Sequence, residues 1–149
     1  MRTCGQSTYF IRMEYWGGIA AALQAFTLPG DRVLCSGPVY SGFIRTVGDL
    51  GRVLCPSMLK PDREGIMRLD LEDMERKILD NKVKAFIFCS PHNPTGRVWD
   101  EDEIRDVAVL CGKYHVLLIS DEIWADFTPG GKAAYTHCHG IGPGKRILP

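Results

Sequence analysis

Two runs of nearly continuous apolar residues, 83–90 and 116–120, limit the possible folds of this chain more than any other feature. Runs of this kind, rich in aromatic and β-branched residues, are typical of parallel strands that are covered on both faces. Between them, Asp100 and Glu103 have the spacing of a capping box, and four apolar residues follow at helical spacing: Ile104, Val107, Ala108 and Cys111. Residues 83–120 therefore predict a strand, a helix and a second strand of an α/β fold.

The upstream part of the chain shows the same alternation. One helix is indicated by four apolar residues at helical spacing, Ile19, Ala22, Leu23 and Phe26, and is expected to end before residue 29. A strand over 32–35 follows it. A shorter stripe indicates a second helix: Phe43, Val47 and Leu50. We expect the next strand, over 53–55, to end at Pro56. Asp70 is expected to cap a third helix, whose apolar side faces inward and consists of Leu71, Met74 and Ile78. This order predicts a three-layer α/β/α architecture with a mainly parallel sheet.

Charge and hydropathy exclude two broad classes of partner. The chain has 18 basic and 18 acidic residues, so it lacks the excess of positive charge that dominates nucleic-acid binding. Its longest apolar stretches, such as 19–23 and 85–89, are far shorter than the roughly 20 residues that span a bilayer. Residues 1–9 contain no hydrophobic core of a signal peptide. We therefore expect no nucleic acid, no membrane and a cytoplasmic location.

The cysteines and the tail do not indicate a metal site. Six cysteines are scattered along the chain without a Cys-x-x-Cys pair, and four lie in apolar runs, where we expect reduced, buried thiols: Cys35, Cys55, Cys89 and Cys111. Residues 127–149 contain eight glycines and prolines and predict a loop. Adjacent side chains in its triplet 137–139, His-Cys-His, point in different directions, so we expect no bound metal.

Three residues that could carry chemistry follow predicted strands. Tyr40 follows the strand at 32–35, Asn93 follows the strand at 83–90, and Asp121 follows the strand at 116–120. Ligands of open parallel sheets bind at the carboxyl ends of the strands, so these residues are expected to meet in one crevice. Each also has an ordinary interpretation: Asn93 in a turn, Asp121 as a cap, Tyr40 as a half-buried aromatic residue.

The motifs around these residues resemble a known family. Residues 90–99, SPHNPTGRVW, followed by 116–123, VLLISDEI, resemble the fold-type I pyridoxal-phosphate enzymes of the aminotransferase class I/II superfamily. The Pro-His-Asn-Pro-Thr-Gly form is most similar to carbon–sulfur lyases of the cystathionine β-lyase type. Residues 25–33 and 38–40 fit the same family in the same order. The resemblance thus assigns 17–127 to part of a large domain, leaving 1–16 unassigned and 128–149 as a loop-rich tail.

The resemblance implies a cofactor, pyridoxal 5′-phosphate, and a role for four residues. Asp121 would pair with the pyridine nitrogen, Asn93 would donate its amide to the ring 3-oxygen, and Tyr40 would stack on the ring. Trp124 stands where many relatives carry a tyrosine or histidine that reaches the 3-oxygen, and its indole N–H can donate. The Asn93–Pro94 peptide bond would be cis. The family acts on small amino-acid substrates and is usually homodimeric.

Other family features are not matched. The Schiff-base lysine lies in a Ser-x-x-Lys-like context, which neither Lys132 nor Lys145 reproduces. We therefore assign no catalytic residue and expect a fragment of the large domain that is inactive alone. Gly17 and Gly18 are the nearest candidates for the loop that holds the phosphate, and the arginine that binds the substrate carboxylate is not found.

Three functions stay open at this point. A carbon–sulfur β-lyase is favoured, a class I/II aminotransferase is the alternative within the same superfamily, and a non-catalytic remnant is the third. An unrelated nucleotide-binding domain is disfavoured because the chain has neither Gly-x-Gly-x-x-Gly nor Gly-x-x-x-x-Gly-Lys.

Overall fold

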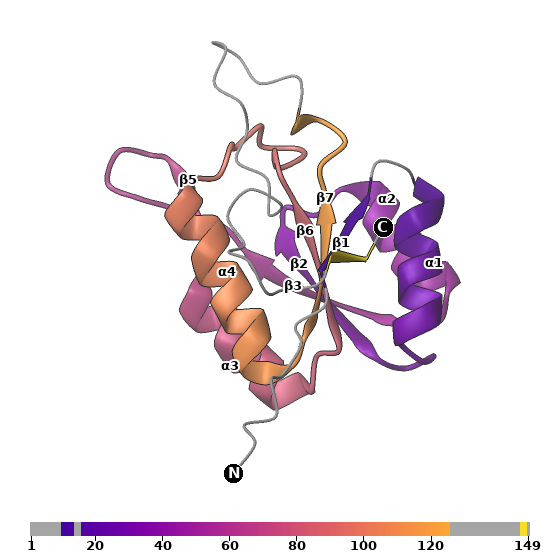
Figure 1. Cartoon of the computed structure of the whole chain (residues 1–149). Coiled ribbons are helices and arrows are strands. Elements are labelled where there is room, and N and C mark those ends of the chain that lie inside the picture. The colour runs from indigo at the N-terminus through magenta and orange to yellow at the C-terminus, as the bar shows by residue number, and fades with distance from the viewer. Residues whose placement is uncertain (1–9, 14–15, 126–146, 149) are drawn as a thin grey trace.

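The chain forms a parallel β-sheet with helices on both faces, as the sequence predicts (Figure 1). The computed structural model describes residues 10–13, 16–125 and 147–148. The sheet has six strands in the order β3-β2-β6-β7-β1-β8, and each neighbouring pair is parallel. The strands are β1 Phe10–Met13, β2 Arg32–Gly37, β3 Val53–Met58, β6 Ala85–Cys89, β7 Leu117–Asp121 and β8 Ile147–Leu148. A separate antiparallel pair consists of β4 Lys60–Pro61 and β5 Met67–Arg68.

Within the described ranges, four helices make the outer layers: α1 Trp16–Phe26, α2 Ser41–Asp49, α3 Leu71–Asn81 and α4 Glu101–Tyr114. Successive side chains of a strand point to opposite faces of the sheet, so the central strands feed two cores. Phe86, Phe88 and Leu118 pack in the cluster that includes α3 and α4, whereas Ile87 and Ile119 pack in the cluster that includes α1 and α2. Every residue of β6 is buried, which confirms that it is a strand covered on both sides.

Local capping fixes where the helices begin. The side chain of Asp70 accepts a hydrogen bond from the backbone N–H of Asp73 at 3.2 Å and caps α3. At α4, the backbone N–H of Asp100 donates to Oε2 of Glu103 at 2.9 Å, which is half of a capping box. Both caps are as predicted, and each satisfies polar groups that a helix terminus leaves without internal partners.

The structure corrects two details of the predicted pattern. Pro56 does not end its strand, because β3 is the edge of the sheet and pairs only with β2, where a missing N–H is tolerated. Phe26 is not part of the buried stripe of α1 and is 47% exposed. The next residue, Thr27, is buried instead, and its hydroxyl donates to the carbonyl of Leu23 at the end of the helix.

The structure also adds elements that the sequence did not indicate. Strand β1 lies within the unassigned segment 1–16 and pairs with β7, and the two-residue strand β8 lies within the tail 128–149. The remainder of both segments lies outside the described residues, and the proposed domain boundaries at 17 and 127 remain predictions. Among the described residues, no helix is long and apolar enough to cross a membrane.

Candidate functional site

A small cavity opens at the carboxyl edge of the sheet, between the ends of β6 and β7 and the helices α1 and α2. Its volume is about 140 Å³, and eight residues line it: Ile19, Tyr40, Phe43, Cys89, Asn93, Asp121, Ile123 and Trp124. The structure thus brings together all four residues that the sequence singled out for a cofactor, namely Tyr40, Asn93, Asp121 and Trp124. A cavity of about 150 Å³ holds one benzene molecule in a protein core, so this space has the size of a single six-membered ring.

Asp121 supplies the negative charge of the cavity. It is the last residue of β7, rather than the residue after the strand, and its side chain is half-buried. Oδ1 accepts a hydrogen bond from the backbone N–H of Ile123 at 3.2 Å, and Oδ2 lies 4.0 Å from Sγ of Cys89. Burial raises the pKa of this carboxyl above its ordinary value, and the hydrogen bond from Ile123 opposes that rise only in part. Among residues 17–125, no ion pair of Asp121 is found.

Asn93 lies in the loop that follows β6. Its backbone N–H donates to Sγ of Cys89 at 3.5 Å, and the bond between Asn93 and Pro94 is cis, as the resemblance implies. The loop closes on itself, because the backbone N–H of His92 donates to the carbonyl of Arg97 at 2.8 Å. Gly96 has a φ of +70°, a conformation that favours glycine, and its N–H donates to the carbonyl of His92 at 2.7 Å. The side chain of Asn93 is therefore presented from a tight turn.

Tyr40 lines the cavity from the start of α2. It occupies the N-cap position of α2, where its carbonyl accepts the backbone N–H of Phe43 at 3.0 Å. The rings of Tyr40 and Phe43 meet edge to face, with centroids 5.5 Å apart and planes at 87°. This contact orients the aromatic ring of Tyr40 at the cavity.

Trp124 stands at the rim and is 51% exposed. It lines the cavity beside Asp121 and also a second, wider hollow of about 360 Å³. The second hollow lies along the loop after β6 and shares Asn93 with the first. Trp124 thus separates the ring-sized cavity from more open space.

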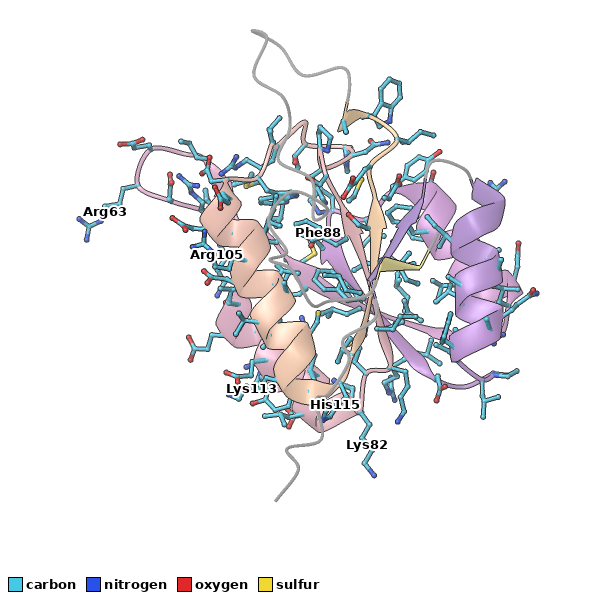
Figure 2. All side chains as sticks on the ribbon, in the orientation of Figure 1. Arg63, Lys82, Phe88, Arg105, Lys113 and His115 are labelled. Atoms are coloured by element: carbon cyan, nitrogen blue, oxygen red, sulfur yellow. The ribbon has the colours of Figure 1, made fainter. Side chains whose placement is uncertain are left out.

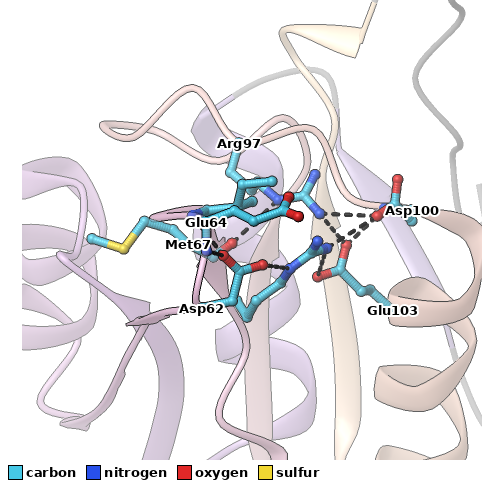
Figure 3. A network of polar contacts seen from close by, with 8 residues as sticks. Asp62, Glu64, Met67, Arg97, Asp100 and Glu103 are labelled. Atoms are coloured by element: carbon cyan, nitrogen blue, oxygen red, sulfur yellow. Dashed lines mark hydrogen bonds and ion pairs between the residues drawn. The ribbon is translucent and has the colours of Figure 1, made fainter.

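The turn that carries Asn93 is anchored at its far end by a charged network (Figure 3). Nη2 of Arg97 lies 2.6 Å from Oε2 of Glu103 and 3.0 Å from Oδ2 of Asp100, both at the start of α4. Nε of Arg97 donates to the carbonyl of Met67 at 3.2 Å, which ties the loop to β5. Arg68 bridges Asp62 to the same two carboxylates of α4.

Cys89 is the site residue that sequence analysis missed. The four cysteines in apolar runs are free and buried, as predicted. Cys89, however, also lines the cavity, and burial together with the nearby charge of Asp121 raises its pKa to about 12, so that it is a neutral thiol. Its position directly before Ser90 and Pro91, at the end of the predicted strand, was a signal that could have identified it.

No lysine among residues 17–125 lines the cavity. Lys82 and Lys113 lie at the opposite end of the sheet (Figure 2). Lys132, Lys145 and the triplet 137–139 lie outside the described residues. Gly17 and Gly18 are in the first turn of α1 rather than in a loop before it. Within the described part of the chain, no group of three or more His, Cys, Asp or Glu side chains could hold a metal ion.

Comparison with known proteins gives consistent results. The model of a family described as aminotransferase class I and II matches residues 15–148. The cystathionine beta-lyase PatB of Bacillus subtilis is 40% identical over 108 residues, which are 72% of this chain and 28% of that protein. An aspartate aminotransferase of Sulfurisphaera tokodaii is 35% identical over 119 residues, 78% of this chain and 30% of that protein. The chain thus spans less than a third of the length of these relatives.

A solved structure shares the fold over most of the chain. The crystal structure of the PLP-bound C-S lyase from Staphylococcus hominis superimposes with a TM-score of 0.81 at 27% identity. The match covers 89% of this chain and 34% of that protein.

Proposed function

Because this chain belongs to the class I and II aminotransferase family of enzymes, we propose that its cavity binds pyridoxal 5′-phosphate and serves a carbon–sulfur β-lyase. One observation carries the proposal. A carboxylate, an amide and an aromatic ring, from Asp121, Asn93 and Tyr40, line a single ring-sized cavity at the carboxyl edge of a parallel sheet.

The donor set of the cavity fits this cofactor. The volume of about 140 Å³ suits the pyridine ring. The carboxylate of Asp121 is half-buried and its pKa is raised, because burial removes water that would stabilise its negative charge. A cationic N–H in the cavity would supply the missing compensation, and a protonated pyridine nitrogen is such a group.

Each residue has a separate task. Pyridoxal 5′-phosphate, when bound, supplies an electron-accepting ring for reactions at the α-carbon of an amino acid. Asp121 holds the proton on the ring nitrogen by its negative charge. Asn93 donates its side-chain amide to the ring 3-oxygen, Trp124 offers an indole N–H at the rim, and Tyr40 covers a ring face and excludes water.

The start of α1 is the proposed place for the phosphate. Gly17 and Gly18 belong to the first turn of α1, and Ile19, in the same turn, lines the cavity. The first N–H groups of a helix have no partners within it and favour an anion. We therefore assign the phosphate to these backbone groups.

The choice of reaction rests on the relatives. The B. subtilis protein and the S. hominis protein are named for carbon–sulfur bond cleavage, and this supports a cysteine thioether as the substrate class. The aminotransferase of S. tokodaii supports amino-group transfer as the alternative. Since no lysine among residues 17–125 lines the cavity, we propose that the 149-residue chain does not turn over substrate by itself. A homodimer and a cytoplasmic location remain predictions.

A chimera tests the proposal. The 108-residue stretch matched in the B. subtilis lyase is replaced by the corresponding stretch of this chain, and the product is assayed with L-cystathionine. We expect release of thiol, pyruvate and ammonia, and loss of that release when Asp121 is replaced by alanine. The same exchange in the S. tokodaii aminotransferase serves as the comparison. Efficient amino-group transfer in that chimera, with no thiol release in the first, would favour the alternative function.

A further inference from the structure

The cofactor cavity has two loop walls, and one buried histidine joins them. We propose that His92 is a positioning residue that fixes the loop carrying Tyr40 against the loop carrying Asn93. The inference rests on the proposed function, because it concerns the same cavity. It assigns to His92 no contact with the cofactor or the substrate.

The ring of His92 has one favoured protonation state. His92 is 2% exposed, Nε2 lies 3.3 Å from the carbonyl oxygen of Ser36, and Nδ1 lies 2.8 Å from Oγ1 of Thr95. A carbonyl oxygen can only accept, so Nε2 carries the proton and donates, while Nδ1 accepts the hydroxyl proton of Thr95. Burial lowers the pKa of His92, in agreement with a neutral ring that uses both nitrogens.

The Nε2 hydrogen bond spans the two walls. Ser36 is the second-to-last residue of β2, and Tyr40 lies four residues later at the N-cap of α2. His92 directly precedes Asn93. The bond therefore ties the segment that leads from Ser36 to Tyr40 to the turn of residues 92–97. His92 is not among the residues that line the cavity, although it lines the neighbouring hollow.

Within its own wall, His92 cannot move alone. Its backbone N–H and carbonyl are both bonded into the turn, to Arg97 and Gly96. Its ring packs edge to face on Trp99, with centroids 5.8 Å apart, and Nε1 of Trp99 donates to the carbonyl of Cys89 at 2.8 Å. A displacement of the His92 ring therefore shifts the turn that presents Asn93.

Pyridoxamine 5′-phosphate is a suitable probe, because it has the ring and phosphate of the cofactor but no aldehyde to react with surface lysines. Its affinity for the 149-residue chain is measured by calorimetry. His92→Phe keeps the packing on Trp99 but removes both side-chain hydrogen bonds, and we expect about tenfold weaker binding. His92→Gln can still donate to Ser36 and accept from Thr95, and we expect a loss of no more than about twofold.

Two further variants separate positioning from general stability. Ser57→Ala removes another buried hydroxyl, which donates to Asp73 at 2.7 Å outside the cavity, and should leave the affinity unchanged. In the Asn93→Ala background, His92→Phe should cost clearly less than in the wild type, because one of the two side chains that it positions is already gone. A full tenfold loss in that background would overturn the inference. Unchanged affinity of His92→Phe, together with weakened binding of Asp121→Asn, would overturn it while the proposed function stands.

A measurement without cofactor completes the test. Amide hydrogen exchange at Asn93 and Gly96 should be at least about tenfold faster in His92→Phe than in the wild type, and close to wild type in His92→Gln and Ser57→Ala. If the wild-type chain binds no pyridoxamine 5′-phosphate, the proposed function fails, and the exchange rates alone decide whether His92 holds the turn. Equal rates in His92→Phe and the wild type would contradict the inference.

Discussion

Oδ2 of Asp121 lies 4.0 Å from Sγ of Cys89, so the carboxylate at the end of β7 has a thiol for its neighbour. Burial, and next to it the charge of Asp121, raise the pKa of Cys89 to about 12, and burial raises the pKa of Asp121. An arrangement of this kind does not stabilise the fold. It places a poorly compensated negative charge beside the cavity, where the proposed function puts the protonated ring nitrogen of the cofactor.

Replacing Asp121 by asparagine should stabilise the cofactor-free chain at pH 7. The folded-state pKa is raised, so the charged carboxylate opposes folding above that pKa, and the gain should shrink as the pH falls through it. We expect an increase in the free energy of unfolding, measured with urea at pH 7. Asp106→Asn, on the exposed side of α4, is the control and should change stability by less than about 0.5 kcal/mol. A clear loss of stability in Asp121→Asn would contradict the assigned role.

His92 should make stability depend on pH. Its pKa is lowered in the folded chain, so its full contribution is present above the ordinary value of 6.5 and is lost as the pH falls toward and through the folded-state pKa. His92→Gln should remove this component, which amounts to at most about 1.4 kcal/mol per pH unit. Urea unfolding at a series of pH values below 6.5 measures the slopes. Identical slopes for the wild type and His92→Gln would show that His92 is not held neutral.

Much of the architecture was accessible from the sequence, because the buried strands and caps are local patterns. The run 83–90 became β6, all of whose residues are buried, and Asp70 caps α3. The end of β3 was mispredicted, since whether Pro56 is tolerated depends on its strand being at the edge of the sheet. Strand β1 was missed because its four residues, Phe-Ile-Arg-Met, have no pattern of their own and are fixed by pairing with β7.

The candidate site was partly accessible for a similar reason. Residues after parallel strands share one edge, so the convergence of Tyr40, Asn93 and Asp121 follows from the topology. The place of Cys89 at the end of its strand pointed to the same edge, but neither its role nor that of His92 could be assigned from topology alone. Their roles depend on which face of the sheet each side chain takes and on contacts between distant loops, such as the bond from His92 to Ser36.

Arg52 should contribute to the stability of the fold and not to binding in the cavity. Its guanidinium donates to the carbonyls of Leu23, Thr27 and Leu50, at the ends of α1 and α2. Arg52→Met leaves these acceptors without that partner, and we expect a loss of about 1–3 kcal/mol in urea unfolding. Arg105→Met, which breaks ion pairs on the exposed face of α4, should cost no more than about 1 kcal/mol. Affinity for pyridoxamine 5′-phosphate should be unchanged in both variants, and a selective loss in Arg52→Met would argue against this division.

Pyridoxal 5′-phosphate should label the lysines of the 149-residue chain weakly and at several positions after reduction with borohydride. A reactive lysine must be placed at the cavity and have a lowered pKa, and no lysine among residues 17–125 lines that cavity. Peptide mapping by mass spectrometry identifies the labelled sites. Stoichiometric labelling of one lysine, accompanied by release of pyruvate from L-cystathionine, would show that the chain is catalytically complete and would contradict our proposal that it is inactive alone.

The most direct test of the account is calorimetric titration of the 149-residue chain with pyridoxamine 5′-phosphate. We predict one saturable site, with affinity at least about tenfold lower in Asp121→Asn, because a hydrogen bond between charged groups is lost, and unchanged in Asp106→Asn. Binding that does not saturate, or that is equally strong in Asp121→Asn and the wild type, would contradict the claim that this cavity is the cofactor site.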